Sequence, residues 1–441
     1  MSLNKSLPVL GAISMALLAA CGAAPTPITI KETVQVQQTV VVEKTVQVPV
    51  TVAPAPTKAP QITLNFWHGY NPVETKLLDE KLIPAFQAAN PGVTVKSQAV
   101  PYDDFHKKLL TAMAGGTAPD IARLDIAWIP EFAEMGALAK LDGMKGFNDL
   151  KGKMYPGPLS TNLWKGSYYG LPLDTNTRTL LWNKEAFAKA GVDAPPKTIE
   201  EFLAACAKLK AANISCFADG GTYGWAVMPW IWTFGGDITD KDMTKATGYM
   251  NGPETIAAYT FLKDMLDKGY LNKGILGGGF DANTAFAKDQ QAMLLEGPWM
   301  PSIFASQFPD KKLNWALTPA GKGGAISVVG GEDIAVFQQS PNKEAAMAFT
   351  AFMLSADTQL AFAGVGQVPV RTDVTDAAVK AQPYFQYFFD QLKTSKARLP
   401  HPNWSKIESV LTDAGQQILR GEKSPKDALD AAAAKADALL K

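Results

Sequence analysis

Seven aromatic residues stand at expected loops and strand ends, where their rings are available to a ring-shaped ligand. They are Trp67, Tyr70, Tyr102, Trp128, Trp230, Trp232 and Trp299. Sugar rings pack their C–H faces on aromatic rings, and their hydroxyls form paired hydrogen bonds with carboxylates, amides and guanidinium groups. Although a single Trp is more often a core residue, the whole set, with nearby acidic and amide residues, predicts a carbohydrate site.

Motifs for catalysis and for metal binding are missing from the sequence. The histidines His68, His106 and His401 are far apart, and no Cys/His cluster has the spacing of a metal site. The glycine-rich stretch 274–279 lacks the Lys-Ser/Thr of a phosphate-binding loop. No pair of carboxylates stands in a diagnostic motif either. The sequence therefore predicts a protein that is not an enzyme and that holds no metal or cofactor.

The charge composition argues against two classes of binding partner. The 42 basic and 42 acidic residues give a formal net charge of zero, and no basic block is present. This balance argues against nucleic acid or an anionic membrane surface as a partner. The length of 441 residues exceeds what one core needs, so we expect two lobes or domains.

From Gln61 onward, strand and helix patterns alternate along the sequence. The strands and helices that they predict must position the candidate aromatic residues. Strands are expected at 61–70, 93–100 and 119–125, and helices at 74–90 and 103–116. This alternation predicts α/β units around parallel sheets.

The expected helices carry recognisable signals. Leu78, Leu82 and Phe86 fall on one face of the first helix. Three later helices have N-terminal caps: Thr198 with Glu201 at capping-box spacing, Ser340 before Pro341, and Ser424 before Pro425.

The N-terminus has the pattern of an export signal. Lys5 precedes an apolar run, Pro8 to Ala20, that is too short to span a bilayer. Leu18-Ala19-Ala20-Cys21 resembles the bacterial lipobox, which predicts cleavage after residues 1–20 and acylation of Cys21. An ordinary signal, cut at the same place and leaving Cys21 as a chance thiol, is the alternative. We expect a lipid-anchored protein of the bacterial cell membrane, outside the cytoplasm.

Residues 21–60 read as a Thr/Val/Pro-rich linker, with Thr/Val/Gln alternation ahead of Ala-Pro repeats. A strand that pairs with another segment is the alternative. The remaining cysteines, Cys206 and Cys216, flank the end of an expected helix and the start of a strand. Because export makes oxidation available, a disulfide is favoured over two buried thiols.

Several stretches, in order, resemble the extracellular solute-binding proteins of family 1, which deliver sugars to ABC importers. They include "PDIARLDIAWIPEFAEMGALAKLD" (119–142), "YYGLPLDTNTRTLLWNKEAF" (168–187), "DANTAFAKDQQAMLLEGPWM" (281–300) and "GQVPVR" (366–371). The resemblance covers essentially all of 61–441. Thr179 stands where a smaller residue is usual, and Trp182 where Tyr is usual.

The resemblance implies a periplasmic-binding-protein-like α/β fold, in which two lobes close by a hinge over a ligand cleft. Three crossings are expected, near Asp174–Thr179, Val328–Asp333 and Val368–Arg371. The N-lobe would then comprise 61–174 plus 332–369, and the C-lobe 175–331 plus 370–441.

The resemblance also implies a set of ligand-binding residues. They are Trp67, His68, Tyr70, Tyr102, Asp125, Trp128, Asp174, Asn176, Trp230, Trp232, Trp299, Glu332, Asp333 and Arg371. Three of them have a structural alternative: Asp125 as a helix cap, Arg371 as a brace of the hinge, and His68 as a strand-end residue.

The implied function is capture of a mono- or oligosaccharide and its delivery to the importer's transmembrane subunits, by a monomer. The "GGED" stretch places Glu332 and Asp333 at a crossing, where they would hold hydroxyls, an amino group or only the hinge. A neutral or amino-bearing sugar is therefore expected. The alternatives are a non-sugar ligand (polyamine, iron or glycerol phosphate) and, with least support, a surface glycoside hydrolase.

Overall fold

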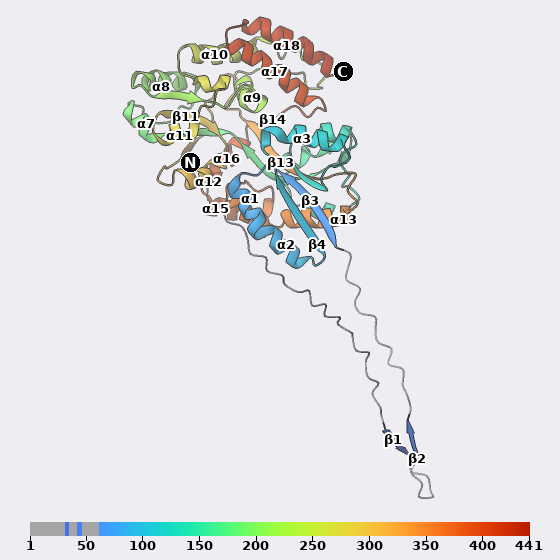
Figure 1. Cartoon of the computed structure of the whole chain (residues 1–441). Helices are drawn as coiled ribbons and strands as arrows, with labels where there is room; N and C mark the ends of the chain where they lie inside the picture. The colour runs from blue at the N-terminus through green and yellow to red at the C-terminus, as the bar shows by residue number, and fades with distance from the viewer. Residues whose placement is uncertain (1–30, 35–41, 46–60) are drawn as a thin grey trace, which may run out of the picture. The chain divides into compact units, whose positions relative to one another are not determined.

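The computed structural model describes residues 31–34, 42–45 and 61–441, which belong to two compact units, 1–59 and 60–441 (Figure 1). In the first unit, β1 (Lys31–Val34) and β2 (Val42–Thr45) pair antiparallel, with Lys31 opposite Thr45. Of the two interpretations of the linker, these residues adopt the paired strand. Cys21 and the export signal lie outside the described residues.

The second unit contains a six-stranded sheet in the order β14-β13-β5-β3-β4, with β8 also paired to β13. Its strands are β3 (Ile62–His68), β4 (Val93–Ala99), β5 (Ile121–Asp125), β8 (Leu171–Thr177), β13 (Val328–Val336) and β14 (Lys396–Ala397). β3 runs parallel to β4 and β5, whereas β13 is antiparallel to β5 and β8.

A four-stranded sheet has the order β10-β11-β9-β12. Its strands are β9 (Thr179–Trp182), β10 (Ser215–Ala218), β11 (Gln291–Glu296) and β12 (Asn314–Ala316). β10 and β11 are parallel, and β9 is antiparallel to both of its neighbours. The predicted α/β architecture is confirmed, but both sheets are mixed rather than parallel, because apolar patterning reports burial and not strand direction.

Helices and short strands connect these sheets. Those before β8 are α1 (Pro72–Leu77), the π-helix η1 (Leu78–Leu82), α2 (Ile83–Ala89), α3 (Tyr102–Ala114), α4 (Ile129–Glu134), α5 (Phe147–Lys151), α6 (Pro156–Ser160) and the pair β6 (Leu163–Trp164) and β7 (Ser167–Tyr168). Those between β9 and β13 are α7 (Lys184–Lys189), α8 (Ile199–Ala211), α9 (Gly224–Thr233), α10 (Pro253–Asp267), η2 (Lys273–Leu276), α11 (Ala282–Ala287) and α12 (Met300–Gln307). Those after β13 are α13 (Lys343–Met353), α14 (Ala356–Ala363), η3 (Thr372–Val374), α15 (Thr375–Ala381), α16 (Phe385–Leu392), α17 (Trp404–Leu419) and α18 (Pro425–Leu439). Figure 1 shows α17 and α18 packed side by side next to α10.

The chain passes from the six-stranded to the four-stranded sheet after β8 and back again before β13. Arg178 alone separates β8 from β9, and the chain returns between β12 and β13. Farther along the chain, Val368 pairs with Thr175 of β8, and the Val368 carbonyl accepts a hydrogen bond from the Thr175 N–H at 3.1 Å. At Gly331 (φ +130°) a Cβ would overlap the carbonyl of Asp174, so glycine allows β13 and β8 to approach here.

Local sequence signals explain most helix starts. Thr198 accepts from the Glu201 N–H, and Ser424 accepts from the Asp427 N–H, so these two caps are confirmed. The cap predicted at Ser340 is wrong: α13 begins two residues later, after Asn342, because the Ser340 hydroxyl bonds to the buried Asp120 carboxylate.

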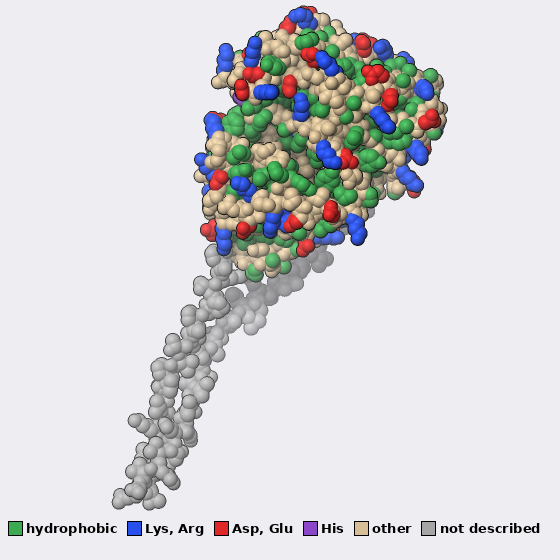
Figure 2. All heavy atoms as spheres, turned by 180° about the vertical axis from the view of Figure 1, so that it is seen from behind, with side chains coloured by type: hydrophobic (Ala, Val, Ile, Leu, Met, Phe, Trp, Pro, Cys, Tyr) green, Lys and Arg blue, Asp and Glu red, His purple; other side chains and the backbone are tan. Residues whose placement is uncertain are grey.

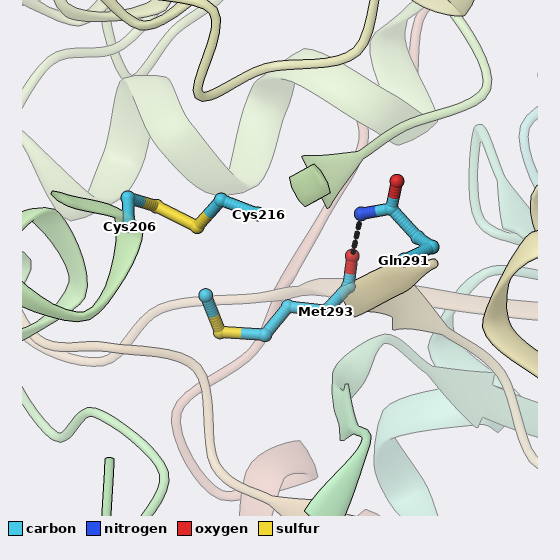
Figure 3. The surroundings of a disulfide bond; sticks show 4 residues. All are labelled: Cys206, Cys216, Gln291 and Met293. Carbon is cyan, nitrogen blue, oxygen red and sulfur yellow. Dashed lines mark hydrogen bonds between the residues drawn. A yellow bond between two sulfur atoms is a disulfide. The ribbon is translucent and has the colours of Figure 1, made fainter. Parts of the chain in front are cut away.

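Cys206 at the buried face of α8 and Cys216 on β10 form a disulfide (Figure 3). Met293 of β11 lies beside it in the same view, and the backbone carbonyl of Met293 accepts from the Gln291 side chain at 3.1 Å. The disulfide therefore fastens α8 to β10, an edge strand of the four-stranded sheet.

The surface of the second unit is mixed in charge. Figure 2 shows acidic and basic side chains interspersed over one face, in keeping with a net charge of zero. Among the residues that the structure describes, no helix is long and apolar enough to cross a membrane. Within the same described residues, no group of three His, Cys, Asp or Glu side chains is arranged to hold a metal ion.

Candidate ligand-binding site

A cavity of about 430 Å³ opens at the place where the two sheets are connected. Its lining residues are Gly69, Asn71, Glu74, Tyr102, Arg123, Asp125, Trp128, Asn176, Tyr223, Trp225, Trp299, Ile303, Gly330, Gly331, Glu332, Gln367, Arg398 and Glu408. They come from the chain before β8, from β8 and β13 themselves, from the segment between β9 and β13, and from the chain after β13. Its size suits a small organic molecule, because such pockets usually enclose about 300–1,000 Å³.

Two aromatic pairs form part of the cavity wall. The rings of Tyr102, at the start of α3, and Trp128, just before α4, are stacked with centroids 5.8 Å apart. The rings of Trp225, on the first turn of α9, and Trp299, just before α12, lie 6.4 Å apart at 33°. The cavity therefore presents flat apolar faces from two separate parts of the chain.

Arg123, in the middle of β5, joins three strands beneath the cavity. Its guanidinium donates to Asp174 on β8 at 3.0 and 3.1 Å and to Glu332 on β13 at 2.7 Å. Burial raises the pKa of the Glu332 carboxyl well above its ordinary value, although Arg123 opposes this shift. Burial alone would lower the pKa of Arg123, but the Asp174 and Glu332 carboxylates outweigh it and raise that pKa. Arg123 is therefore held fully charged between two carboxyl groups.

A second charged group lies at the end of β5. Arg398 Nη2 donates to both carboxylate oxygens of Asp125, at 2.7 and 2.9 Å, and the Tyr102 hydroxyl donates to the same carboxylate. The Arg398 guanidinium also lies 5.7 Å from the ring centre of Trp225. Asp125 in addition accepts from the Ala127 N–H at 2.8 Å, so it caps a local turn as well as lining the cavity.

Three polar atoms on lining residues have no hydrogen-bond partner within the described part of the chain: Asn176 Oδ1, Gln367 Oε1 and Arg398 Nε. The residues concerned are at least nine-tenths buried, with Asn176 and Gln367 each 4% exposed. A buried polar atom without a partner costs about 1–3 kcal/mol. A ligand with hydroxyl or amino groups would remove this cost.

The structure brings six of the residues expected to bind ligand to this cavity, and it places the others elsewhere. Those at the cavity are Tyr102, Asp125, Trp128, Asn176, Trp299 and Glu332. The other expected residues do not line this cavity, and they make the following contacts within the protein.

Near β3, three side chains face the protein interior or its outer surface. His68 is fully buried, shares a hydrogen bond with Ser97 at 2.8 Å and has its pKa lowered to about 3, first by burial and then by Arg123. Tyr70 is buried and stacks on Phe362. Trp67 carries the Lys108 ammonium over its ring at 4.9 Å. His68 thus behaves as the structural residue named as its alternative.

Two tryptophans of α9 belong to the core. Trp230 packs between Phe202 and Phe217, with ring centroids 5.8 and 5.5 Å away. Trp232 is 3% exposed and donates to Asp237 at 3.2 Å. Both are members of the buried apolar core, and neither lines the cavity.

At the expected crossings, three charged side chains form hydrogen bonds or ion pairs with other protein groups and do not line the cavity. Asp174 lies behind the cavity wall, bonded to Arg123. Asp333 is fully buried and accepts from Asn162 Nδ2 at 2.8 Å. Arg371 donates to the Leu354 carbonyl and to Asp373, both at 2.9 Å, which is the bracing role named as its alternative.

Sequence reasoning missed the residues that complete the cavity. Arg123 had a visible signal, since a charged residue in the buried strand "PDIARLD" needs a buried partner. Trp225 lies on the first turn of α9 and was not among the residues expected to bind ligand. Arg398 lies in a segment without strand or helix periodicity, and Glu408 lies on the polar face of α17. Neither position carried a sequence signal for ligand binding.

Comparison with known proteins gives consistent matches. A sequence model of the bacterial extracellular solute-binding protein family matches residues 71–360. A binding protein of Brucella abortus is 30% identical over 385 residues, covering 82% of this chain and 89% of that protein.

Two solved structures share the whole fold. The GacH receptor of Streptomyces glaucescens, solved unliganded and with acarbose, is 26% identical with a TM-score of 0.79 and covers 86% of this chain and 98% of its own. An ABC transporter solute-binding protein of Thermotoga lettingae, bound to α-D-tagatose, is 29% identical with a TM-score of 0.78, covering 86% of this chain and all of its own. The resemblance noted from the sequence motifs is confirmed.

Proposed function

The chain belongs to the bacterial extracellular solute-binding proteins, and from this we propose that it captures a mono- or oligosaccharide for an ABC importer. The observation that carries the proposal is the cavity itself. Tyr102–Trp128 and Trp225–Trp299 offer flat faces, while Asn176 and Gln367 have buried amide oxygens that no group in the described part of the chain pairs with. Aromatic stacking combined with directed hydrogen bonds is what recognition of a sugar requires.

Capture would occur by closure of two lobes around the cavity. We assign the N-lobe to 61–174 plus 332–369 and the C-lobe to 175–331 plus 370–441. Three observations support these lobes. Arg178 connects β8 to β9, Val368 pairs with Thr175 near that connection, and both lobes contribute residues that line the cavity. Hinge closure around a ligand needs only a few residues that change their backbone angles.

The protein would carry its ligand unchanged, as a monomer, and pass it to the transmembrane subunits of the importer. The family is extracytoplasmic, and the lipobox-like sequence ending at Cys21 supports a lipid anchor with residues 21–60 as the linker. The known members with matching structures are binding proteins, which favours transport over hydrolysis.

A thermal-unfolding screen tests the proposal. The full-length chain is heated with mono- and disaccharides, spermidine, ferric citrate and glycerol phosphate. A ligand at a hundred times its Kd should stabilise the fold by about 2.7 kcal/mol. A saccharide that raises the Tm and is recovered unchanged supports the proposal. A response to spermidine, iron or glycerol phosphate alone would contradict the carbohydrate assignment, and consumption of the sugar would contradict the carrier role.

A further inference from the structure

Carboxylates outnumber guanidinium groups at the cavity. Its lining holds Glu74, Asp125, Glu332 and Glu408, against the two arginines. A fifth carboxylate, Asp174, lies directly behind the wall on Arg123. With all of these groups ionised, the surroundings of the cavity are negative.

The two arginines are already committed within the protein. Arg123 is shared by Asp174 and Glu332, and Arg398 is bound by both oxygens of Asp125. An anionic ligand would therefore approach guanidinium groups whose charge is balanced by at least as many carboxylates. Such an arrangement disfavours phosphorylated or acidic sugars.

The carboxylates differ in how many oxygens remain for a ligand. Both oxygens of Asp125 and both of Glu74 accept hydrogen bonds from protein groups. Glu332 uses only Oε2, toward Arg123 Nη2, and Glu408 uses only Oε1, toward the Gly224 N–H at 2.9 Å. Within the described residues, no N–H or hydroxyl group donates to the second oxygen of Glu332 or to that of Glu408, although the Glu332 carboxyl also lies within hydrogen-bond reach of the Asp174 carboxyl.

Buried amide oxygens at the same cavity favour a ligand with several hydrogen-bond donors, and this observation is independent of the carboxylates. Gln367, 4% exposed, gives its Nε2 to the Glu74 carboxylate, and this fixes the amide so that Oε1 is left unpartnered among the described residues. Asn176, also 4% exposed, leaves its Oδ1 without a partner in the same part of the chain. Its oxygen has room because residue 330 is a glycine, where a Cβ would overlap it.

We propose that the ligand is a saccharide that carries a protonated amine, held between Glu332 and Glu408. This inference rests on the proposed function and narrows it. The free carboxylate oxygens bind the ammonium, the amide oxygens of Asn176 and Gln367 accept from hydroxyls, and the aromatic faces hold the ring and attract the cation.

Binding of a cation at this place is coupled to proton release. Burial raises the pKa of both Glu332 and Glu408 above their ordinary values. Glu332 faces Arg123 and Asp125 on β5 and Asp174 on β8, while Glu408 faces Arg398, Asp125 and His106. An approaching ammonium favours the ionised carboxylates, so the fraction that is protonated gives up its proton.

Matched sugars test the inference on the full-length chain by isothermal titration calorimetry near neutral pH. The sets are glucose, glucosamine and N-acetylglucosamine, and cellobiose with the fully deacetylated chitosan disaccharide. In at least one set the amine form should bind about tenfold or more tighter than its neutral counterparts. E332Q and E408Q each keep the oxygen that the protein uses and replace the free one with a donor, so they should abolish this ratio. E134Q, on the exposed pair with Lys165, is the control and should retain it.

Each result decides between the two proposals. Neutral sugars that bind as tightly as their amines, or a preference that E332Q and E408Q leave intact, would overturn the inference and leave carbohydrate capture standing. Binding of spermidine with no response to any saccharide, or no binding at all, would overturn both. Circular dichroism and Tm of each variant show that a lost ratio does not come from misfolding.

Discussion

Arg398 donates from a single nitrogen to both carboxylate oxygens of Asp125, at 2.7 and 2.9 Å, and both side chains are buried. The pair joins the end of β5, in the six-stranded sheet, to the segment that leads into α17. It therefore ties together parts of the chain that the proposed hinge would move relative to each other.

Replacing Arg398 with Met should destabilise the fold strongly. The change leaves the Asp125 carboxylate buried without its cation, and breaking a buried pair from one side costs about 3–5 kcal/mol. The double variant D125N/R398M removes both charges and should recover part of that loss. Urea unfolding of the two single variants and the double variant measures the coupling energy. Additive losses would contradict an energetic link between the residues.

Trp225→Ala and Trp299→Ala should each weaken ligand binding. Either change removes a flat face from the cavity, and aromatic contacts contribute about 0.5–1.5 kcal/mol beyond the area they bury. Affinity for the saccharide found by the thermal screen should fall about tenfold or more in a titration. Trp164→Ala, at the Glu134 contact outside the cavity, is the matched control. If all three variants changed the affinity equally, Trp225 and Trp299 would not be ligand-contacting residues.

The sequence predicted the fold better than the site. Apolar spacing placed Leu78, Leu82 and Phe86 correctly, and all three are buried. Local caps such as Thr198 and Ser424 were visible because a cap depends only on residues a few positions apart. Strand direction was not visible, since it depends on connections between distant segments.

The site was predicted only in part because it is assembled from distant segments. Trp128 follows β5, a position that sequence can recognise, and Asn176 lies near the end of β8; both line the cavity. Trp230 was expected to contact ligand, but it packs against Phe202 and Phe217, whereas Trp225 on the same helix lines the cavity. Arg398 contacts Asp125 across 273 positions, a relation that no local pattern encodes.

Asp333 should make stability fall as the pH rises. Burial raises the pKa of this carboxyl well above its ordinary value of 3.8, with Asn162 and Thr161 opposing the shift. The folded state therefore binds more protons than the unfolded state above about pH 4, and the contribution is lost as the pH rises toward the folded pKa. D333N does not titrate there, so the Tm of the wild type minus that of D333N should decrease from about pH 5 to pH 8. A difference that stays constant or grows would contradict the shift.

Cys21→Ser should release the protein from the membrane. The lipid chains predicted on this thiol would be the anchor, and no described helix is long and apolar enough to cross a membrane in their place. In a bacterial host, wild-type protein should incorporate a labelled fatty acid and fractionate with membranes, while C21S should be unlabelled and soluble. C206S, which leaves Cys21 in place, is the control. Labelled C21S would place the lipid elsewhere.

The disulfide between Cys206 and Cys216 should matter for stability but not for binding. It closes a short loop with a sequence separation of 10, and the loss of unfolded-chain entropy on closing such a loop is about 3 kcal/mol. Both sulfurs are buried in the core beside Met293, away from the cavity. The C206A/C216A variant should lose a few degrees of Tm and keep its ligand affinity. Because both residues are at most 1% exposed, dithiothreitol should reduce the native protein far more slowly than protein unfolded in urea. Rapid reduction of the folded chain would mean that α8 opens locally from β10.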